Sequence, residues 1–173
     1  IVAHLGGGIT LSLHSKGRII DMISDDEGPF SPERAGGLPG FQVIKMATSG
    51  DYDYRAMMKK VRRNGGLMSY FNTSDLREVF KMADEGDEKA KLVSEAMAHN
   101  VAKNIGKLAV VTCGEINAIV LTGGIAHSEK FTGWIEKRVK FIAPVNVIAG
   151  ENEMEALALG AYRVMTGEEQ AKE

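Results

Sequence analysis

The sequence predicts an α/β domain built on a mixed β-sheet, and three observations support this prediction. Apolar and polar residues alternate over most of residues 1–24, which is typical of consecutive short strands. Residues 87–112 carry apolar side chains at helical spacing. Apolar runs and helical patterns then alternate to residue 166, which predicts parallel strands joined by right-handed crossovers. The expected order is β-β-β-α-β-α-β-α, with extra helices inserted before the long one.

The first part of the chain is expected to form three strands, over residues 1–7, 9–15 and 18–24. The glycine triplet Gly6-Gly7-Gly8 separates the first two, and Lys16-Gly17 is the hairpin turn before the third. Residues 25–40 form a long acidic loop rich in glycine and proline. Loops of this length in compact domains are usually either functional or disordered.

Helices are predicted over 41–49 and 53–63, and Asn64-Gly65-Gly66 is expected to end the second of them. Further helices are expected over 75–84 and 87–112. The buried face of the longest helix is predicted to consist of Val93, Met97, Val101, Ile105, Leu108 and Ala109. The chain then alternates between strands and helices, with strands at 116–122 and 145–149 and helices at 128–139 and 153–166.

The composition suits one soluble domain of 173 residues, with 44% hydrophobic and 25% charged residues. The net charge of −2 argues against nucleic-acid or membrane-surface binding driven by bulk charge. No apolar run is long enough to span a bilayer. The single cysteine, Cys113, excludes an internal disulfide, is expected to be buried at a helix end, and favours a reducing cytoplasm.

Two glycine motifs follow apolar runs and are candidates for ligand binding. They are His4-Leu5-Gly6-Gly7-Gly8-Ile9-Thr10 and Leu121-Thr122-Gly123-Gly124-Ile125-Ala126. Glycines at such turns let backbone N–H groups approach phosphate oxygens. A tight hairpin without a ligand is the alternative for a single triplet, but two such loops in one chain favour nucleotide binding.

Five segments, in this order, resemble the butyrate kinases closely and the acetate kinases more distantly. They are residues 4–9, 28–39, 73–78, 121–126 and 150–153, and Gly28-Pro29-Phe30-Ser31-Pro32-Glu33-Arg34 favours the butyrate kinases. The order of elements is similar to the ribonuclease-H-like half-domain shared by actin, the heat-shock ATPases and the sugar and acetate kinases. The resemblance implies reversible phosphoryl transfer between ATP and a short-chain carboxylate such as butyrate, in a cleft between two similar domains.

The resemblance implies a catalytic role for Arg34, whose guanidinium would neutralise charge on the transferred phosphoryl group. His4 would donate a hydrogen bond to that group or to the carboxylate. Gly6, Gly7 and Gly8 would let the backbone approach the β- and γ-phosphates, although acetate kinases carry Asn in the place of Gly7. The alternatives are an arginine that pairs with Glu33 or Asp26, and a structural histidine at a strand end.

The resemblance also implies a nucleotide site and a magnesium site. Asp75, Leu76 and Arg77 would flank adenine, while Gly123, Gly124 and Ile125 would lie against the adenosine and the α-phosphate. Glu153 would position Mg²⁺, directly or through water. Alternatively, Asp75 is only a helix cap and Glu153 only stabilises a helix N-terminus. The expected ligands are therefore ATP or ADP with Mg²⁺.

The chain opens inside a strand and does not begin with Met, so residues 1–173 are expected to be the C-terminal nucleotide-binding domain of a two-domain acyl kinase. The N-terminal domain would be absent, the fragment alone would be inactive, and self-association is expected. Two other interpretations remain: a non-catalytic nucleotide-binding or assembly module, and a kinase for acetate, propionate or a branched acid.

Overall fold

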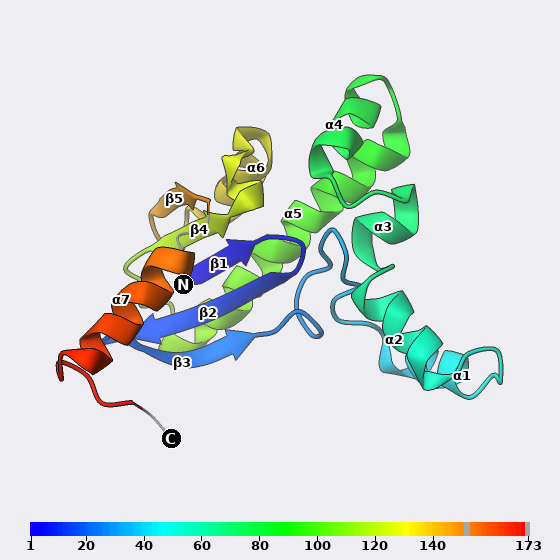
Figure 1. Cartoon of the computed structure of the whole chain (residues 1–173). Helices are drawn as coiled ribbons and strands as arrows, with labels where there is room; N and C mark the ends of the chain where they lie inside the picture. Colours follow the sequence, from blue (N-terminus) through cyan, green and yellow to red (C-terminus); the bar gives the residue numbers. More distant parts are fainter. Residues whose placement is uncertain (151–152, 172–173) are drawn as a thin grey trace.

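A computed structural model of the chain describes residues 1–150 and 153–171. Its centre is a five-stranded sheet in the order β3-β2-β1-β4-β5 (Figure 1). The inner strand β1 pairs antiparallel with β2 and parallel with β4, and β5 continues the parallel part, so the predicted mixed sheet is confirmed. The strands are β1 (Val2–Leu5), β2 (Ile9–Ser15), β3 (Arg18–Ile23), β4 (Ile119–Gly123) and β5 (Val145–Ala149).

Helices fill the segments before β4, between β4 and β5, and after β5. They are α1 (Gly40–Ala47), α2 (Tyr54–Arg62), α3 (Gly66–Phe71), α4 (Leu76–Asp84), α5 (Glu88–Ala109), α6 (Glu129–Val139) and α7 (Glu153–Met165), with 3₁₀ turns η1 (Val110–Thr112) and η2 (Gly124–His127). The sequence did not predict α3. The glycine pair after Asn64 ends α2 as expected, but Gly66 then starts a short helix from a positive φ of 56°.

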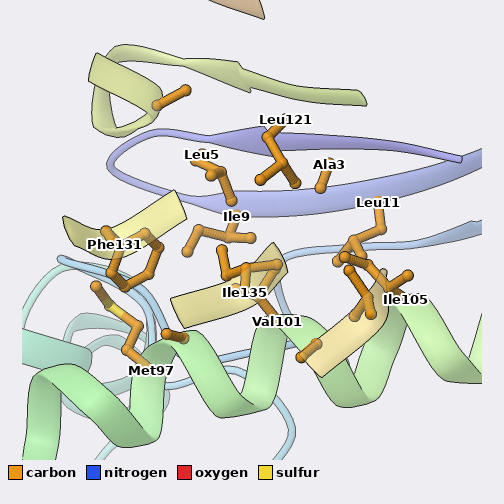
Figure 2. Packing of buried hydrophobic residues seen from close by; sticks show 14 of the residues in the cluster. Ala3, Leu5, Ile9, Leu11, Met97, Val101, Ile105, Leu121, Phe131 and Ile135 are labelled. Atoms are coloured by element: carbon orange, nitrogen blue, oxygen red, sulfur yellow. The ribbon is translucent and has the colours of Figure 1, made fainter. Parts of the chain in front are cut away.

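One face of the sheet forms the hydrophobic core together with α5 and α6 (Figure 2). Alternate strand residues point into it, such as Ala3 and Leu5 of β1, and Ile9 and Leu11 of β2. The buried stripe predicted for the long helix is confirmed at every position, and α6 adds Phe131 and Ile135. Each fully buried large apolar side chain contributes about 1.5–3 kcal/mol to folding.

The opposite face of the sheet is only partly covered. His4, Thr10 and Ser12 are half-buried there, while Met22 and Ile148, which the strand registers place on this face, are exposed. In Figure 1, α7 passes in front of the sheet and α5 lies behind it. None of the helices described is long and apolar enough to cross a membrane.

Cys113 was expected to be buried, and this expectation is wrong. Helix α5 ends at Ala109, the chain tightens into η1, and Cys113 follows as its cap with a positive φ of 53°. Cys113 therefore lies beyond the end of the helix, and its side chain is exposed.

A ring contact joins α4 to α6. Phe80 and Trp134 form a T-shaped pair with a centroid distance of 5.6 Å and an interplanar angle of 84°. The ammonium group of Lys130 lies 4.8 Å from the Phe80 ring centroid and 2.8 Å from a carboxylate oxygen of Asp84. These contacts fix α4 relative to α6, the helix that follows β4 and η2.

Candidate functional site

The candidate residues gather at the carboxyl ends of the parallel strands β1, β4 and β5. The glycine triplet follows β1, η2 follows β4, and Gly150 follows β5. The two later turns are tied together, because Gly123 and Gly150 exchange backbone hydrogen bonds of 3.1 Å. Thr122 adds a third bond through its hydroxyl, which donates to the Gly150 carbonyl at 3.2 Å. Ligands of open α/β sheets bind at this edge.

The glycine turn after β1 could accommodate a β-carbon at Gly7 and at Gly8 without a clash. None of Gly6, Gly7 and Gly8 has a positive φ. A β-carbon at Gly7 would come no closer than 3.7 Å to Glu33, and one at Gly8 no closer than 3.7 Å to Asp25. Neither the backbone conformation nor a clash therefore requires glycine at these two positions, and the missing side chains leave the main chain accessible to a ligand.

The loop that carries Arg34 is attached to this turn. The Ser31 hydroxyl donates to the Gly7 carbonyl at 2.7 Å, and the Glu33 amide donates to the same oxygen at 3.1 Å. Ser31 is fully buried, and its Oγ also accepts from the Arg34 amide at 3.1 Å. The long acidic loop of the sequence is therefore an ordered structure held against the glycine turn.

His4 lies on the sheet face that points away from the core. Its register partners are Thr10 on β2 and Thr122 on β4. A β-carbon at Gly6 would lie 3.1 Å from His4 Nε2, so the imidazole packs against the start of the glycine turn. His4 and the glycine triplet thus lie together at the carboxyl end of β1, and their predicted roles in catalysis and phosphate binding remain predictions.

Arg34 is held by two carboxylates and a backbone carbonyl. Its Nε donates to Asp25 Oδ2 at 2.8 Å, its Nη1 lies 3.5 Å from Glu33 Oε2, and Nη1 also donates to the carbonyl of Arg62. Arg62 Nη2 reaches the same Asp25 oxygen at 3.3 Å. The predicted pairing with Glu33 is present, but the other partner is Asp25 and not Asp26, whose carboxylate accepts from Ser24.

Burial and hydrogen bonding act in opposite directions on Asp25. Partial burial of the carboxylate would by itself raise the pKa of Asp25, but the hydrogen bonds and charges of Arg34 and Arg62 together lower this pKa below its ordinary value. Asp25 is therefore an anion at neutral pH and serves both arginines as a fixed acceptor.

A pocket of about 720 Å³ lies between the start of α4 and the turn after β4. It brings together two segments that are far apart in the sequence and that were both predicted to bind the nucleotide. Its wall consists of Ser74, Asp75, Leu76, Arg77, Phe80, Gly124, Ile125, His127 and Ser128. Ser74, Phe80, His127 and Ser128 were not predicted as site residues, although Phe80 is four residues after Leu76 and so shares its helix face.

Gly123 was predicted to contact the nucleotide, but it does not line this pocket. It is buried with a φ of 92°, and a β-carbon there would lie 2.5 Å from the Leu5 carbonyl oxygen. Gly123 lets β4 pass close to the end of β1. Gly124 has no heavy atom within 4 Å of the position of its missing β-carbon, so it leaves the pocket open.

Asp75 has two structural roles at the mouth of the pocket. Its side chain accepts from the Arg77 amide at 2.9 Å and so caps α4. It also accepts from the Arg77 guanidinium, at 2.9 Å from Nε and 2.6 Å from Nη2. These bonds lower the pKa of Asp75 and raise that of Arg77. Arg77 is otherwise exposed, which leaves one face of its guanidinium open to a ligand.

The metal prediction falls at the edge of the described residues. Glu153 is the first residue of α7, but its side chain lies outside the part of the chain that the structure describes. Within residues 1–150 and 154–171, no group of three or more His, Cys, Asp or Glu side chains could hold a metal ion. The described residues alone therefore do not provide the ligands that a protein-bound metal ion needs.

The mixed sheet, its helices and the glycine turns at its parallel edge define an actin-like ATPase fold. Two solved structures show the same fold: acetate kinase of Porphyromonas gingivalis, with a TM-score of 0.85 at 17% identity, and a propionate kinase of Francisella tularensis, with a TM-score of 0.79 at 22% identity. The matches cover 95% and 88% of this chain, but only 48% and 46% of those chains.

The family model described as the acetokinase family matches residues 1–154, so the chain belongs to the acetokinase family. Butyrate kinase 1 of Clostridium acetobutylicum is 49% identical over 100% of this chain and 49% of its own length. A probable butyrate kinase of Bacteroides thetaiotaomicron is 45% identical over 97% of this chain and 48% of its own length. The chain thus spans about half the length of the curated relatives it matches.

Proposed function

We propose that this chain is the C-terminal, nucleotide-binding half of a two-domain acyl kinase that phosphorylates butyrate reversibly with ATP. The observation that carries the proposal is the match, over nearly the whole chain, to relatives named butyrate kinases. The geometry supports it, because the predicted phosphate and adenosine segments meet at the carboxyl edge of the parallel strands.

In the forward reaction a carboxylate oxygen of butyrate attacks the γ-phosphorus of ATP. The new bond between this oxygen and phosphorus forms as the bond from the γ-phosphorus to the β,γ-bridging oxygen breaks, and ADP leaves with that electron pair. Charge is spread over the equatorial oxygens, so catalysis depends on positioning and charge neutralisation. Arg34 supplies a permanent cation, and His4 donates a hydrogen bond beside the glycine turn.

The nucleotide is proposed to extend from the pocket to the glycine turn. The adenosine lies between Leu76 and Ile125, with Arg77 across the mouth of the pocket and Gly124 leaving room for it. The amides of Gly7 and Gly8 face the β- and γ-phosphates, while the Gly6 amide shapes the turn by donating to the Gly8 carbonyl at 3.1 Å. Mg²⁺ bound with the nucleotide supplies further charge neutralisation on the phosphate oxygens, and Glu153 is the proposed protein carboxylate for it.

Three further properties are part of this proposal. The other half of the site belongs to an N-terminal domain, so the chain alone is expected to have negligible kinase activity. Self-association is supported by exposed apolar side chains on α1 and α7, such as Phe41 and Leu157, and sedimentation at micromolar concentration tests it. A cytoplasmic location fits a chain whose single cysteine is free and exposed.

The first test is calorimetric titration of the chain with Mg-ADP. Saturable binding is expected in the wild type, with weaker binding in Arg77→Ala and in Gly124→Leu, whose side chain fills the pocket. Arg18→Ala is the matched control, because it removes an exposed arginine from the far edge of the sheet. Wild-type binding that neither pocket variant weakens would place the nucleotide elsewhere.

The second test is turnover by the two-domain protein that contains this chain. Butyrate, acetate, propionate and isobutyrate are offered with Mg-ATP, and acyl phosphate is trapped as the hydroxamate. The highest kcat/KM is expected with butyrate. A preference for another acid would correct the substrate, and no turnover with any of them would favour the non-catalytic module.

A further inference from the structure

Asp25 binds two arginines, Arg34 of its own loop and Arg62 of α2. It directly follows Ser24, just beyond the end of β3, while Arg62 ends α2. The carboxylate is mostly buried, with 21% of its side chain exposed, and its Oδ2 accepts from Arg34 Nε at 2.8 Å and from Arg62 Nη2 at 3.3 Å. We call these three residues the Asp25 cluster.

The Asp25 cluster leaves one side of the Arg34 guanidinium available. The Nε–H group is used by Asp25, and Nη1 by the Arg62 carbonyl and the Glu33 carboxylate. Within residues 1–150 and 153–171, no hydrogen bond of the structure uses Nη2. Two of the five donors of an arginine are thus oriented by the protein and left for a ligand.

The Asp25 cluster also lies against the glycine turn. A β-carbon at Gly8 would lie 3.7 Å from Asp25 Cβ and 3.8 Å from Arg34 Cγ. The side chains of Asp25 and Arg34 therefore both pack against Gly8, next to the turn that is proposed to bind the phosphates.

We propose that Asp25 is a positioning residue that orients the Arg34 guanidinium for phosphoryl transfer. The proposal rests on the proposed function, which gives Arg34 its role at the phosphoryl group. An arginine side chain has many rotamers, and a fixed carboxylate on Nε removes most of them before the ligand arrives. Preorganised donors act on the transition state without the cost of reorientation during the reaction.

Nuclear magnetic resonance of the Arg34 side chain tests the geometry independently of activity. In the wild-type chain the Arg34 Hε proton is expected to exchange slowly with water. Asp25→Asn should speed this exchange about 10- to 100-fold, the effect of losing a hydrogen bond between charged groups. Asp26→Asn removes the same charge one residue away and should leave it unchanged. Equal exchange in wild type and Asp25→Asn would overturn the proposal.

Kinetics of the two-domain protein test the consequence. Asp25→Asn should lower kcat about 10- to 100-fold with the KM for ATP changed less than about threefold, because the nucleotide pocket is untouched. Asp25→Glu, which keeps the charge, should recover part of kcat, and Asp26→Asn should match the wild type. All variants are assayed well below their melting temperatures, so that a lower kcat does not come from unfolding of the variant.

The outcomes separate the two proposals. Wild-type turnover together with an unchanged kcat in Asp25→Asn would overturn the positioning role and leave the proposed function standing. A wild-type two-domain protein that phosphorylates no carboxylate would refute the proposed function and, with it, the catalytic part of this proposal, while the Hε exchange would still decide whether Asp25 orients Arg34.

Discussion

The α-carbon of Gly66 lies so close to the Ser31 carbonyl oxygen that a β-carbon at residue 66 would overlap it. Leu67 donates its amide to the same oxygen at 3.2 Å. Ser31 in turn binds the Gly7 carbonyl and the Arg34 amide. Through these contacts the start of α3, the Arg34 loop and the glycine turn form one unit.

Gly66→Ala should therefore destabilise the chain by about 2–4 kcal/mol, because it adds both a steric overlap and an unfavourable positive φ. Gly106→Ala is the control, since Gly106 lies within α5 with no atom within 4 Å of the added carbon and should gain about 0.5–1 kcal/mol. Urea denaturation measures both. Equal stabilities would show that the loop adapts to the extra carbon.

The adjacent glycines after β4 should respond differently to alanine. Gly123→Ala meets the Leu5 backbone and a positive φ, so a loss of about 2–4 kcal/mol is expected. Gly124→Ala enters open space and should change the free energy of unfolding by less than about 0.5 kcal/mol. Thermal melting compares the pair. A large loss in Gly124→Ala would mean that the turn is tighter than the structure shows.

Arg34→Lys should lower the turnover of the two-domain protein by about 10³-fold, the lower end of what a charge-stabilising arginine contributes to phosphoryl transfer. Lysine keeps the charge but lacks the planar fork that can bind Asp25 and a phosphate together. Initial rates with Mg-ATP and butyrate measure the effect. Arg63→Lys, on a neighbouring exposed residue, is the control, and comparable rates in both variants would contradict the role of Arg34.

Acid should weaken the fold partly through Asp25. Its pKa is lowered in the folded chain, so between that value and the unfolded value of about 3.9 the unfolded chain binds more protons. The stability that Asp25 contributes is complete above this window and is lost as pH falls through the folded pKa. The free energy of unfolding, measured by denaturation from about pH 6 to about pH 2.5, should therefore fall less steeply with decreasing pH in Asp25→Asn than in the wild type. An equal slope in the two proteins would show that Asp25 contributes nothing to the loss of stability in acid.

Local patterns in the sequence were sufficient for most of the fold. The stripe of α5 and the alternation in β2 are set by burial on one face, and burial is visible as periodicity. Only the family resemblance predicted that the segments at Asp75 and Gly124 belong to one nucleotide site. They line the same pocket although they are far apart in the sequence, and no local pattern predicts such a contact.

Other features depend on contacts that no local pattern records. Asp25 and Asp26 are identical neighbours in the sequence, and only the path of the loop decides that Arg34 binds the former. Gly123 and Gly124 are likewise neighbours, but only Gly123 lies against the Leu5 backbone. This contact results from the pairing of β4 with β1 in the sheet and leaves no local sequence pattern. Helix α3 was not predicted, because glycines usually end a helix. Here Gly65 and Gly66 instead allow a new helix to start in close contact with Ser31.

The contact between Phe80 and Trp134 has an experimental consequence. Trp134 is the only tryptophan of the chain, and the ring it touches is part of the pocket wall. Indole emission depends on the packing and polarity around the ring, so a ligand that shifts Phe80 also changes the light emitted by Trp134. Trp134 is thus expected to report optically on any ligand that moves Phe80, and the affinity for such unlabelled compounds could be read from intrinsic fluorescence.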